Sequence, residues 1–190
     1  MYRMYKVLMV FTLSIFIPFI SFAQSRHSPY VGQEKREIKA LSEGDIEGYL
    51  TGQGMGFAKA AELNHYPGPK HVLDLAEELR LSKEQLDRTK ETYNKMHKEA
   101  VSIGRQIVEK ETFLDNSFAS QKIDEKSLLE MAIEIARLQG ELRAVHLKAH
   151  LEMKEILSPQ QIDRYDELRG YQGGGGKYKH QHHKYHGGHH

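Results

Sequence analysis

The sequence predicts an all-α protein built on a long antiparallel helical hairpin with shorter flanking helices. Three observations predict this class. Two long stretches carry apolar residues at steps of three and four, a short polar segment separates them, and serine capping sequences recur at expected helix starts. Between residues 41 and 168, prolines occur only at 67, 69 and 159. The 190 residues suit one domain with tails.

The two long helices are expected over residues 83–114 and 124–156, the second being the longest in the chain. Both apolar stripes have a mean period of 3.5, which is typical of helices that pack lengthwise. Because the connector 115–123 is short and polar, the pair should form an antiparallel hairpin. One stripe per helix leaves the seam partly uncovered, so we expect the shorter helices or a second copy to cover it, and hence a homodimer. The stripes are Leu86, Thr89, Tyr93, Met96, Ala100, Ile103 and Ile107, then Leu128, Met131, Ile135, Leu138, Leu142, Val145 and Ala149.

Shorter helices should flank this hairpin. Residues 43–63 carry a helical pattern, although three glycines weaken its centre. Residues 66–69 read as a turn, residues 71–80 as about three helical turns, and a last helix should begin at Pro159 and end near Gly170. Residues 24–40 are polar and aperiodic, which indicates a flexible lead segment.

Three of the expected helix starts share a capping sequence. Ser82 with Gln85, and Ser158 with Gln161, each place a serine N-cap three residues before a glutamine, between two apolar residues. Residues 41–46 form a looser copy with aspartate in the third position. The serine hydroxyl accepts from the backbone N–H three residues on, and that residue's side chain accepts from the serine N–H. Taken alone, such caps contribute only ~1 kcal/mol each.

Leu81-Ser82-x-x-Gln85 and Leu157-Ser158-x-x-Gln161 resemble the paired L-T-x-x-Q motifs of the Spy/CpxP family of periplasmic proteins, with serine in place of threonine. The resemblance covers residues 41–171. It implies a small all-α protein that dimerises into a curved cradle. Some members hold unfolding clients without ATP. Others, the zinc resistance-associated protein and the CnrX-type nickel/cobalt sensors, bind metal and report it to an envelope-stress pathway.

The N-terminus is typical of an export signal. Arg3 and Lys6 precede an apolar run over residues 7–22, and small residues stand at the two recognition positions before a cut after Ala23. The alternative is a membrane anchor, but the run has 16 residues and contains Pro18, whereas a spanning helix needs about 20. We therefore expect a cleaved signal peptide, residues 1–23, and a periplasmic location. Its removal leaves 25 basic against 26 acidic residues.

A first candidate metal site lies on the longest expected helix. His146, His150 and Met153 follow at steps of four and three, so they project from one flank, and two imidazoles with a thioether suit Zn²⁺, Ni²⁺ or Cu²⁺. The cluster resembles the His/Met position of CnrX-type sensors. Those sensors also bring histidines from the first helix, and here that region offers His71 but no His pair at the expected spacing. The alternative makes His146 an interface residue, Met153 core and His150 solvated. A zinc peptidase is excluded because Leu147 replaces the glutamate of H-E-x-x-H.

The tail, residues 172–190, is the stronger metal signal. Four glycines precede a tract of Lys, Tyr, Gly and His, which should be disordered because it can bury no core. Neutral imidazoles on a flexible chain chelate borderline divalent ions such as Zn²⁺, Ni²⁺, Co²⁺ or Cu²⁺. The alternatives are a basic tail that touches anionic surfaces and a purification tag, although tags are usually uninterrupted. The chelating residues are His180, His182, His183, His186, His189 and His190.

Composition excludes several other classes. A formal net charge of +1 gives no support for a nucleic-acid partner, and the absence of cysteine excludes disulfides and thiolate sites. No catalytic motif is found, so we expect neither an enzyme nor a required cofactor. We expect an envelope-stress protein with ATP-independent chaperone activity, divalent-metal binding, or both. The alternative is a heavy-metal sensor or buffer, or a regulatory partner of an envelope sensor.

Overall fold

A computed structural model describes residues 28–171 of the chain. The expected signal peptide and the histidine tail lie outside these residues. Residues 28–34 belong to a unit of their own, made of turns that lead into a short 3-10 helix, η1 (Gln33–Lys35). Everything below concerns the second unit, from residue 35 onward.

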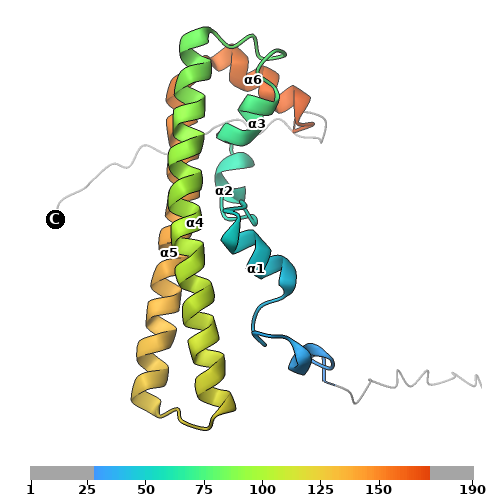
Figure 1. The fold of residues 1–190 in the computed structure, drawn as a ribbon. Helices are drawn as coiled ribbons and strands as arrows, with labels where there is room; N and C mark the ends of the chain where they lie inside the picture. Colours follow the sequence, from blue (N-terminus) through green and yellow to red (C-terminus); the bar gives the residue numbers. More distant parts are fainter. Residues whose placement is uncertain (1–27, 172–190) are drawn as a thin grey trace, which may run out of the picture. The chain divides into compact units, whose positions relative to one another are not determined.

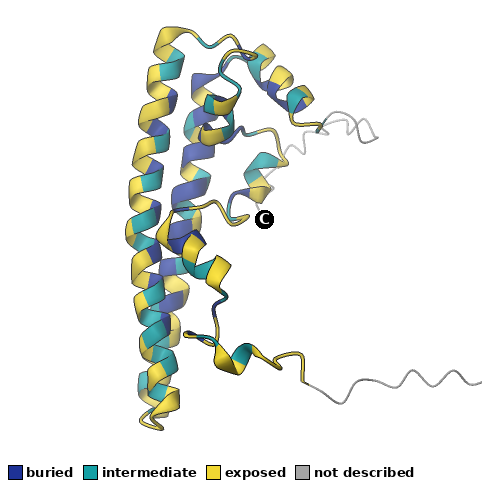
Figure 2. Ribbon diagram, turned by 45° about the vertical axis from the view of Figure 1, so that its right-hand side comes forward, coloured by how far each residue is buried: buried dark blue, intermediate teal, exposed yellow. Residues whose placement is uncertain are grey.

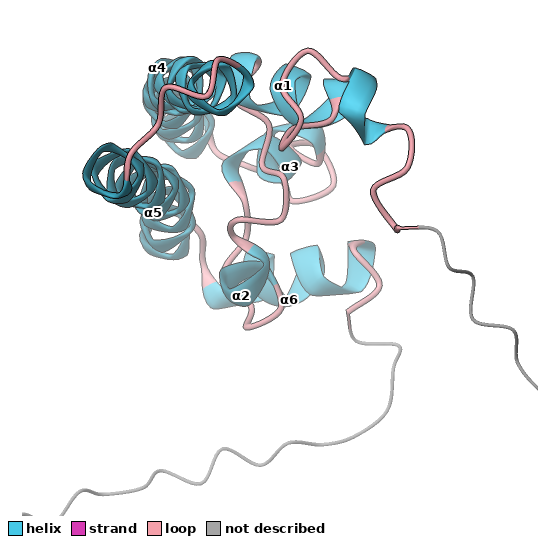
Figure 3. Ribbon diagram, turned by 90° about the horizontal axis from the view of Figure 1, so that it is seen from below, coloured by secondary structure: helices cyan, strands magenta, loops and turns pink. Residues whose placement is uncertain are grey.

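The predicted all-α hairpin is confirmed for the described residues, which form helices and no strand. Helices α4 and α5 run side by side in opposite directions (Figure 1). Helices α1, α2 and α3 lie on one side of this hairpin, and α6 lies across the end at which α4 begins (Figures 1 and 3). None of the described helices is long and apolar enough to cross a membrane. The bounds are α1 Glu43–Leu50, α2 Lys59–Glu62, α3 Pro69–Asp74, α4 Lys83–Ala119, α5 Glu125–Ile156 and α6 Pro159–Leu168.

Helix lengths differ from the sequence prediction in three places. The longest helix is α4, with 37 residues against 32 for α5. Its polar end stays helical to Ala119, and the hydroxyls of Ser117 and Ser120 donate to the carbonyls of Phe113 and Asn116 there. The expected 43–63 helix is two helices, since Gly52 and Gly56 adopt left-handed φ values of 64° and 78° between them. The expected 71–80 helix ends at Asp74 and continues as turns.

The core consists of two clusters. The larger joins the predicted hairpin seam to the α1 region, and the smaller lies where α6 meets α3 and the end of α5. Figure 2 shows the buried residues on the inner sides of α4 and α5. The seam is buried from Ile135 to Ala149, whereas Leu128, near the hairpin loop, is 37% exposed. The larger cluster is Ile38, Leu41, Tyr49, Met96, Ala100, Ile107, Leu138, Leu142, Val145 and Ala149.

A close backbone contact places α1 on the hairpin. A Cβ atom added to Gly104 of α4 would lie only 2.1 Å from the carbonyl oxygen of Tyr49. Any side chain at this position would push α1 away, so glycine is required for the approach. Beside it, the imidazole Nε2 of His97 lies 3.0 Å from the carbonyl oxygen of Thr51, at the C-terminal end of α1.

Candidate functional site

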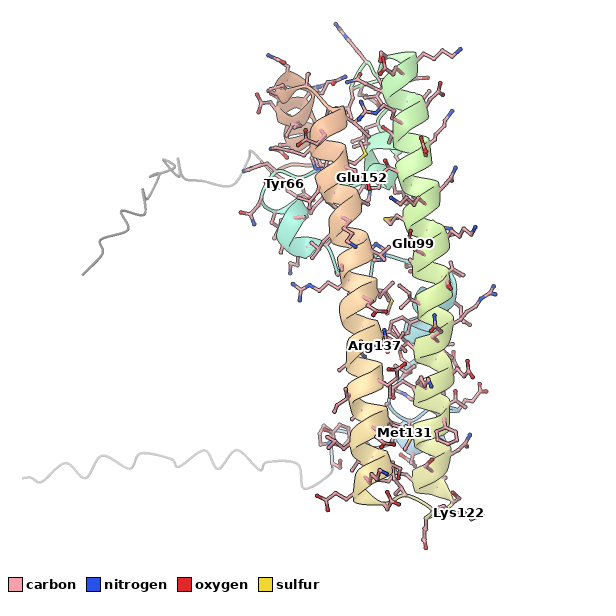
Figure 4. All side chains as sticks on the ribbon, turned by 90° about the vertical axis from the view of Figure 1, so that its left-hand side faces the viewer. Tyr66, Glu99, Lys122, Met131, Arg137 and Glu152 are labelled. Carbon is pink, nitrogen blue, oxygen red and sulfur yellow. The ribbon has the colours of Figure 1, made fainter. Side chains whose placement is uncertain are left out.

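A groove lined by residues of α4 and α5 lies near the loop that joins these helices. Phe113 of α4 is 62% exposed here, and Met131 of α5 is partly buried. Figure 4 shows Met131 in the same half of the hairpin as Lys122, which lies in the connecting loop. We call this the tip groove. Its lining residues are Glu109, Lys110, Thr112, Phe113, Asn116, Glu130, Met131 and Glu134.

Charges of both signs surround the apolar part of the tip groove. Glu109, Glu130 and Glu134 face Lys110, and hydrogen bonds from Arg137 hold the pKa of Glu134 below its ordinary value. Exposed apolar side chains ringed by charge mark an interaction surface. The tip groove can therefore take up an apolar segment of a partner while the rim stays hydrated.

The opposite end of the hairpin is closed by the two serine–glutamine motifs. Both are capping boxes: Ser82 accepts from the backbone N–H of Gln85 and Ser158 from that of Gln161, and each glutamine accepts from its serine's N–H. The two glutamine side chains also meet, with Gln85 Nε2 2.8 Å from Gln161 Oε1. The predicted caps are thus confirmed, and the motifs join the starts of α4 and α6.

The structure places His146, His150 and Met153 on the inner side of α5. His146 is 3% exposed and stacks on Phe57, and its burial lowers its pKa. His150 is also buried, and its Nδ1 donates to the carbonyl of Tyr66 at 2.7 Å. Met153 is fully buried in the smaller core cluster.

These positions bear on the two alternatives for His146, His150 and Met153, a metal site or a packing role. His146 and His150 are both buried, against Phe57 and the carbonyl of Tyr66 respectively, and Met153 packs as core. Within residues 28–171, no group of three or more His, Asp or Glu side chains is arranged to hold a metal ion. His150 is buried, contrary to the expectation that it would be solvated in the absence of metal. The tail histidines lie outside the described residues.

The sequence did not predict a polar cluster around Glu62. Glu62 Oε1 accepts from the hydroxyls of Tyr165 at 2.6 Å and Tyr171 at 2.9 Å. Arg169 Nε lies 3.5 Å from the same oxygen, and His150 Nδ1 lies 3.7 Å from Glu62 Oε2. Burial and the carboxylate raise the pKa of Tyr165. These contacts tie α2 to α6 and to the residues that directly follow it.

A further polar contact lies beside this cluster. His65 Nδ1 is 2.6 Å from Asp166 Oδ2, and the Asp166 side chain is only 4% exposed. Three buried side-chain atoms of the described chain make no hydrogen bond: Glu62 Oε2, His146 Nε2 and Asp166 Oδ1. The four-residue helix α2 gives no periodic signal, so only the buried face of α6, with Tyr165 and Asp166, could have indicated this cluster from sequence.

Comparison of the chain with models of protein families, with curated proteins and with solved structures found no match.

Proposed function

We propose that this chain is an exported envelope-stress protein of the Spy/CpxP type that acts as a homodimer in the periplasm and holds partly folded clients without ATP. The tip groove is the observation that carries the proposal, because it presents exposed Phe113 beside Met131 within a mixed-charge rim. The paired motifs at Ser82–Gln85 and Ser158–Gln161, together with the export-type N-terminus, support the family assignment.

The chemistry of the groove suits reversible holding. Burial of an apolar side chain contributes about 1.5–3 kcal/mol, so one groove gives weak binding to any single segment. Rim charges of both signs accommodate clients of different sequence. The proposed role is therefore binding, with no reaction step and no resident cofactor.

Client holding is tested by light scattering of a chemically denatured protein diluted into buffer without ATP. At an equimolar ratio, the purified chain should delay or reduce aggregation of the diluted client. Scattering identical to that of the client alone would overturn the proposal.

Divalent-metal binding is the second candidate function. It is favoured by the two buried imidazoles, His146 and His150, one with an unpartnered Nε2, and by the six histidines of residues 180–190. Zn²⁺, Ni²⁺, Co²⁺ and Cu²⁺ are the ions that such donors prefer. A regulatory partner of an envelope sensor would need neither client holding nor metal binding.

Calorimetric titration of Zn²⁺, Ni²⁺, Co²⁺ and Cu²⁺ separates these cases. The intact chain is compared with a chain truncated at Gln172, which lacks the histidine tail. Saturable binding in both forms supports a helix site, and binding lost on truncation assigns the metal to the tail. No saturable binding in either form would reject the metal function.

A further inference from the structure

We propose that a second copy of this chain packs antiparallel along the outer face of α5, with the two-fold axis at Gly140. The sequence alone gives no face or register for the expected homodimer. This inference rests on the geometry of α5, so it stands or fails independently of client holding.

Helix α5 carries a second apolar stripe, which includes three exposed large side chains, while Ala144 and Leu147 are partly buried. Leu129, Ile133 and Leu151 are 60%, 59% and 56% exposed. At 100° per residue the stripe fits an arc of about 80°, on the side of α5 opposite the buried seam. Figure 3 shows α5 at the edge of the bundle, with α1, α3 and the other short helices on the far side. The stripe is Leu129, Ile133, Ala136, Gly140, Ala144, Leu147 and Leu151.

The stripe is symmetric about Gly140, and this symmetry indicates the partner. Leu129 and Leu151 lie 11 positions either side of it, Ile133 and Leu147 lie 7, and the two alanines lie 4. In a two-fold interface, residue i contacts residue j while j contacts i. An antiparallel second copy therefore pairs large side chains with large ones at both ends and small with small in the middle.

Gly140 suits the crossing point. In its own chain, a Cβ atom at Gly140 would meet no atom within 4 Å, so this glycine serves no contact inside the described chain. A glycine in an exposed helix interior costs about 1 kcal/mol relative to alanine. Small residues let two helix backbones approach closely, and Ala136, Gly140 and Ala144 provide that approach at the axis.

The charges beside the stripe fix the direction of the pair. Glu130 and Lys148 lie on one flank of it, and neither makes an ion pair within the described residues of its own chain. They stand 18 residues apart, or about 27 Å along the helix, so they cannot reach each other there. In the antiparallel register Glu130 faces Lys148 of the second copy. In a parallel register Glu130 would stay about 27 Å along the axis from Lys148 of the second copy, so the two charges could not pair.

Cysteine cross-linking tests the register directly, because the chain contains no cysteine. Leu129→Cys and Leu151→Cys chains are oxidised separately and as an equimolar mixture. The antiparallel pair predicts a strong disulfide-linked dimer in the mixture and little in either sample alone. Each variant linking mainly to itself would indicate a parallel pair, and no cross-linking in any sample would indicate another face. Either result overturns the proposal.

Charge reversal and Gly140→Lys give independent evidence by analytical ultracentrifugation. Glu130→Lys or Lys148→Glu alone should weaken the dimer by roughly tenfold, and the double variant should recover most of the loss. Gly140→Lys should abolish the dimer while its monomer unfolds at an equal or higher temperature, so misfolding cannot explain the loss. The interface would also be refuted if the wild-type chain stayed monomeric over a 100-fold range of concentration. It would equally be refuted if Gly140→Lys formed a dimer of unchanged affinity.

Discussion

The side-chain amides of Gln85 and Gln161 form a reciprocal pair of hydrogen bonds, 2.8 Å from Gln85 Nε2 to Gln161 Oε1 and 3.0 Å in the other direction. Each amide also donates to a carbonyl of another element, Gln85 to Ile156 and Gln161 to Leu79. The two helix caps are therefore one connected unit. It links the starts of α4 and α6 to the end of α5 and to the segment after α3.

Removing either glutamine should destabilise the hairpin base. Gln85→Ala or Gln161→Ala leaves partly buried donors and acceptors unpaired, and we expect the free energy of unfolding to fall by about 1–3 kcal/mol. The loss of unfolding free energy in the double variant should be smaller than the sum of the two single losses, because the first change already breaks the hydrogen bonds between the two amides. Urea denaturation measures this. Exposed Gln160→Ala is the control, and strict additivity would contradict the coupling.

Two glycine substitutions on the hairpin should act in opposite directions. Gly104→Ala places Cβ against the Tyr49 carbonyl, and displacement of α1 should cost about 1–3 kcal/mol. Gly140→Ala meets open space, so better helix propensity should raise the stability of the dilute monomer by ~1 kcal/mol. Thermal unfolding compares the two. Similar shifts for both would show that the α1 contact does not govern stability.

Glu111 should make stability depend on pH. Burial raises the pKa of this carboxyl above its ordinary value, so in the window above pH 4.5 the folded state binds more protons than the unfolded state. Stability should then fall as pH rises through that window and stay lower at pH 7.

Replacing Glu111 with glutamine tests this sign. Glu111→Gln should raise the free energy of unfolding at pH 7 by roughly 0.5–1 kcal/mol and leave it unchanged below pH 4. Glu109→Gln is the control, because Glu109 is exposed and lies two residues before Glu111. A Glu111→Gln chain that is less stable at pH 7 would indicate a favourable partner for the charge.

The sequence predicted the features that depend on local signals. The seam from Ile135 to Ala149 and the caps at Ser82 and Ser158 repeat at helical spacing, so both could be read without a structure. Contacts between distant elements could not. The Glu62–Tyr165 hydrogen bond joins residues 103 positions apart, and no period in the sequence encodes it.

The split of the 43–63 helix shows a second limit. Gly52 and Gly56 were expected only to weaken a continuous helix, whereas their left-handed φ values end the helix and form a turn between α1 and α2. The choice between a tolerated glycine and a turn depends on what the flanking helices contact. Here the approach of Tyr49 to Gly104 places α1 on α4, while α2 packs on α5.

Client aggregation in the presence of two matched variants tests the central claim most directly. Phe113 and Phe118 are 62% and 54% exposed on α4, but only Phe113 lines the tip groove. Light scattering at equimolar ratio should show that Phe113→Ser loses most of the protection and that Phe118→Ser retains it, with equal unfolding temperatures. Protection unchanged by Phe113→Ser, or absent from the wild-type chain, would contradict client holding at the tip groove.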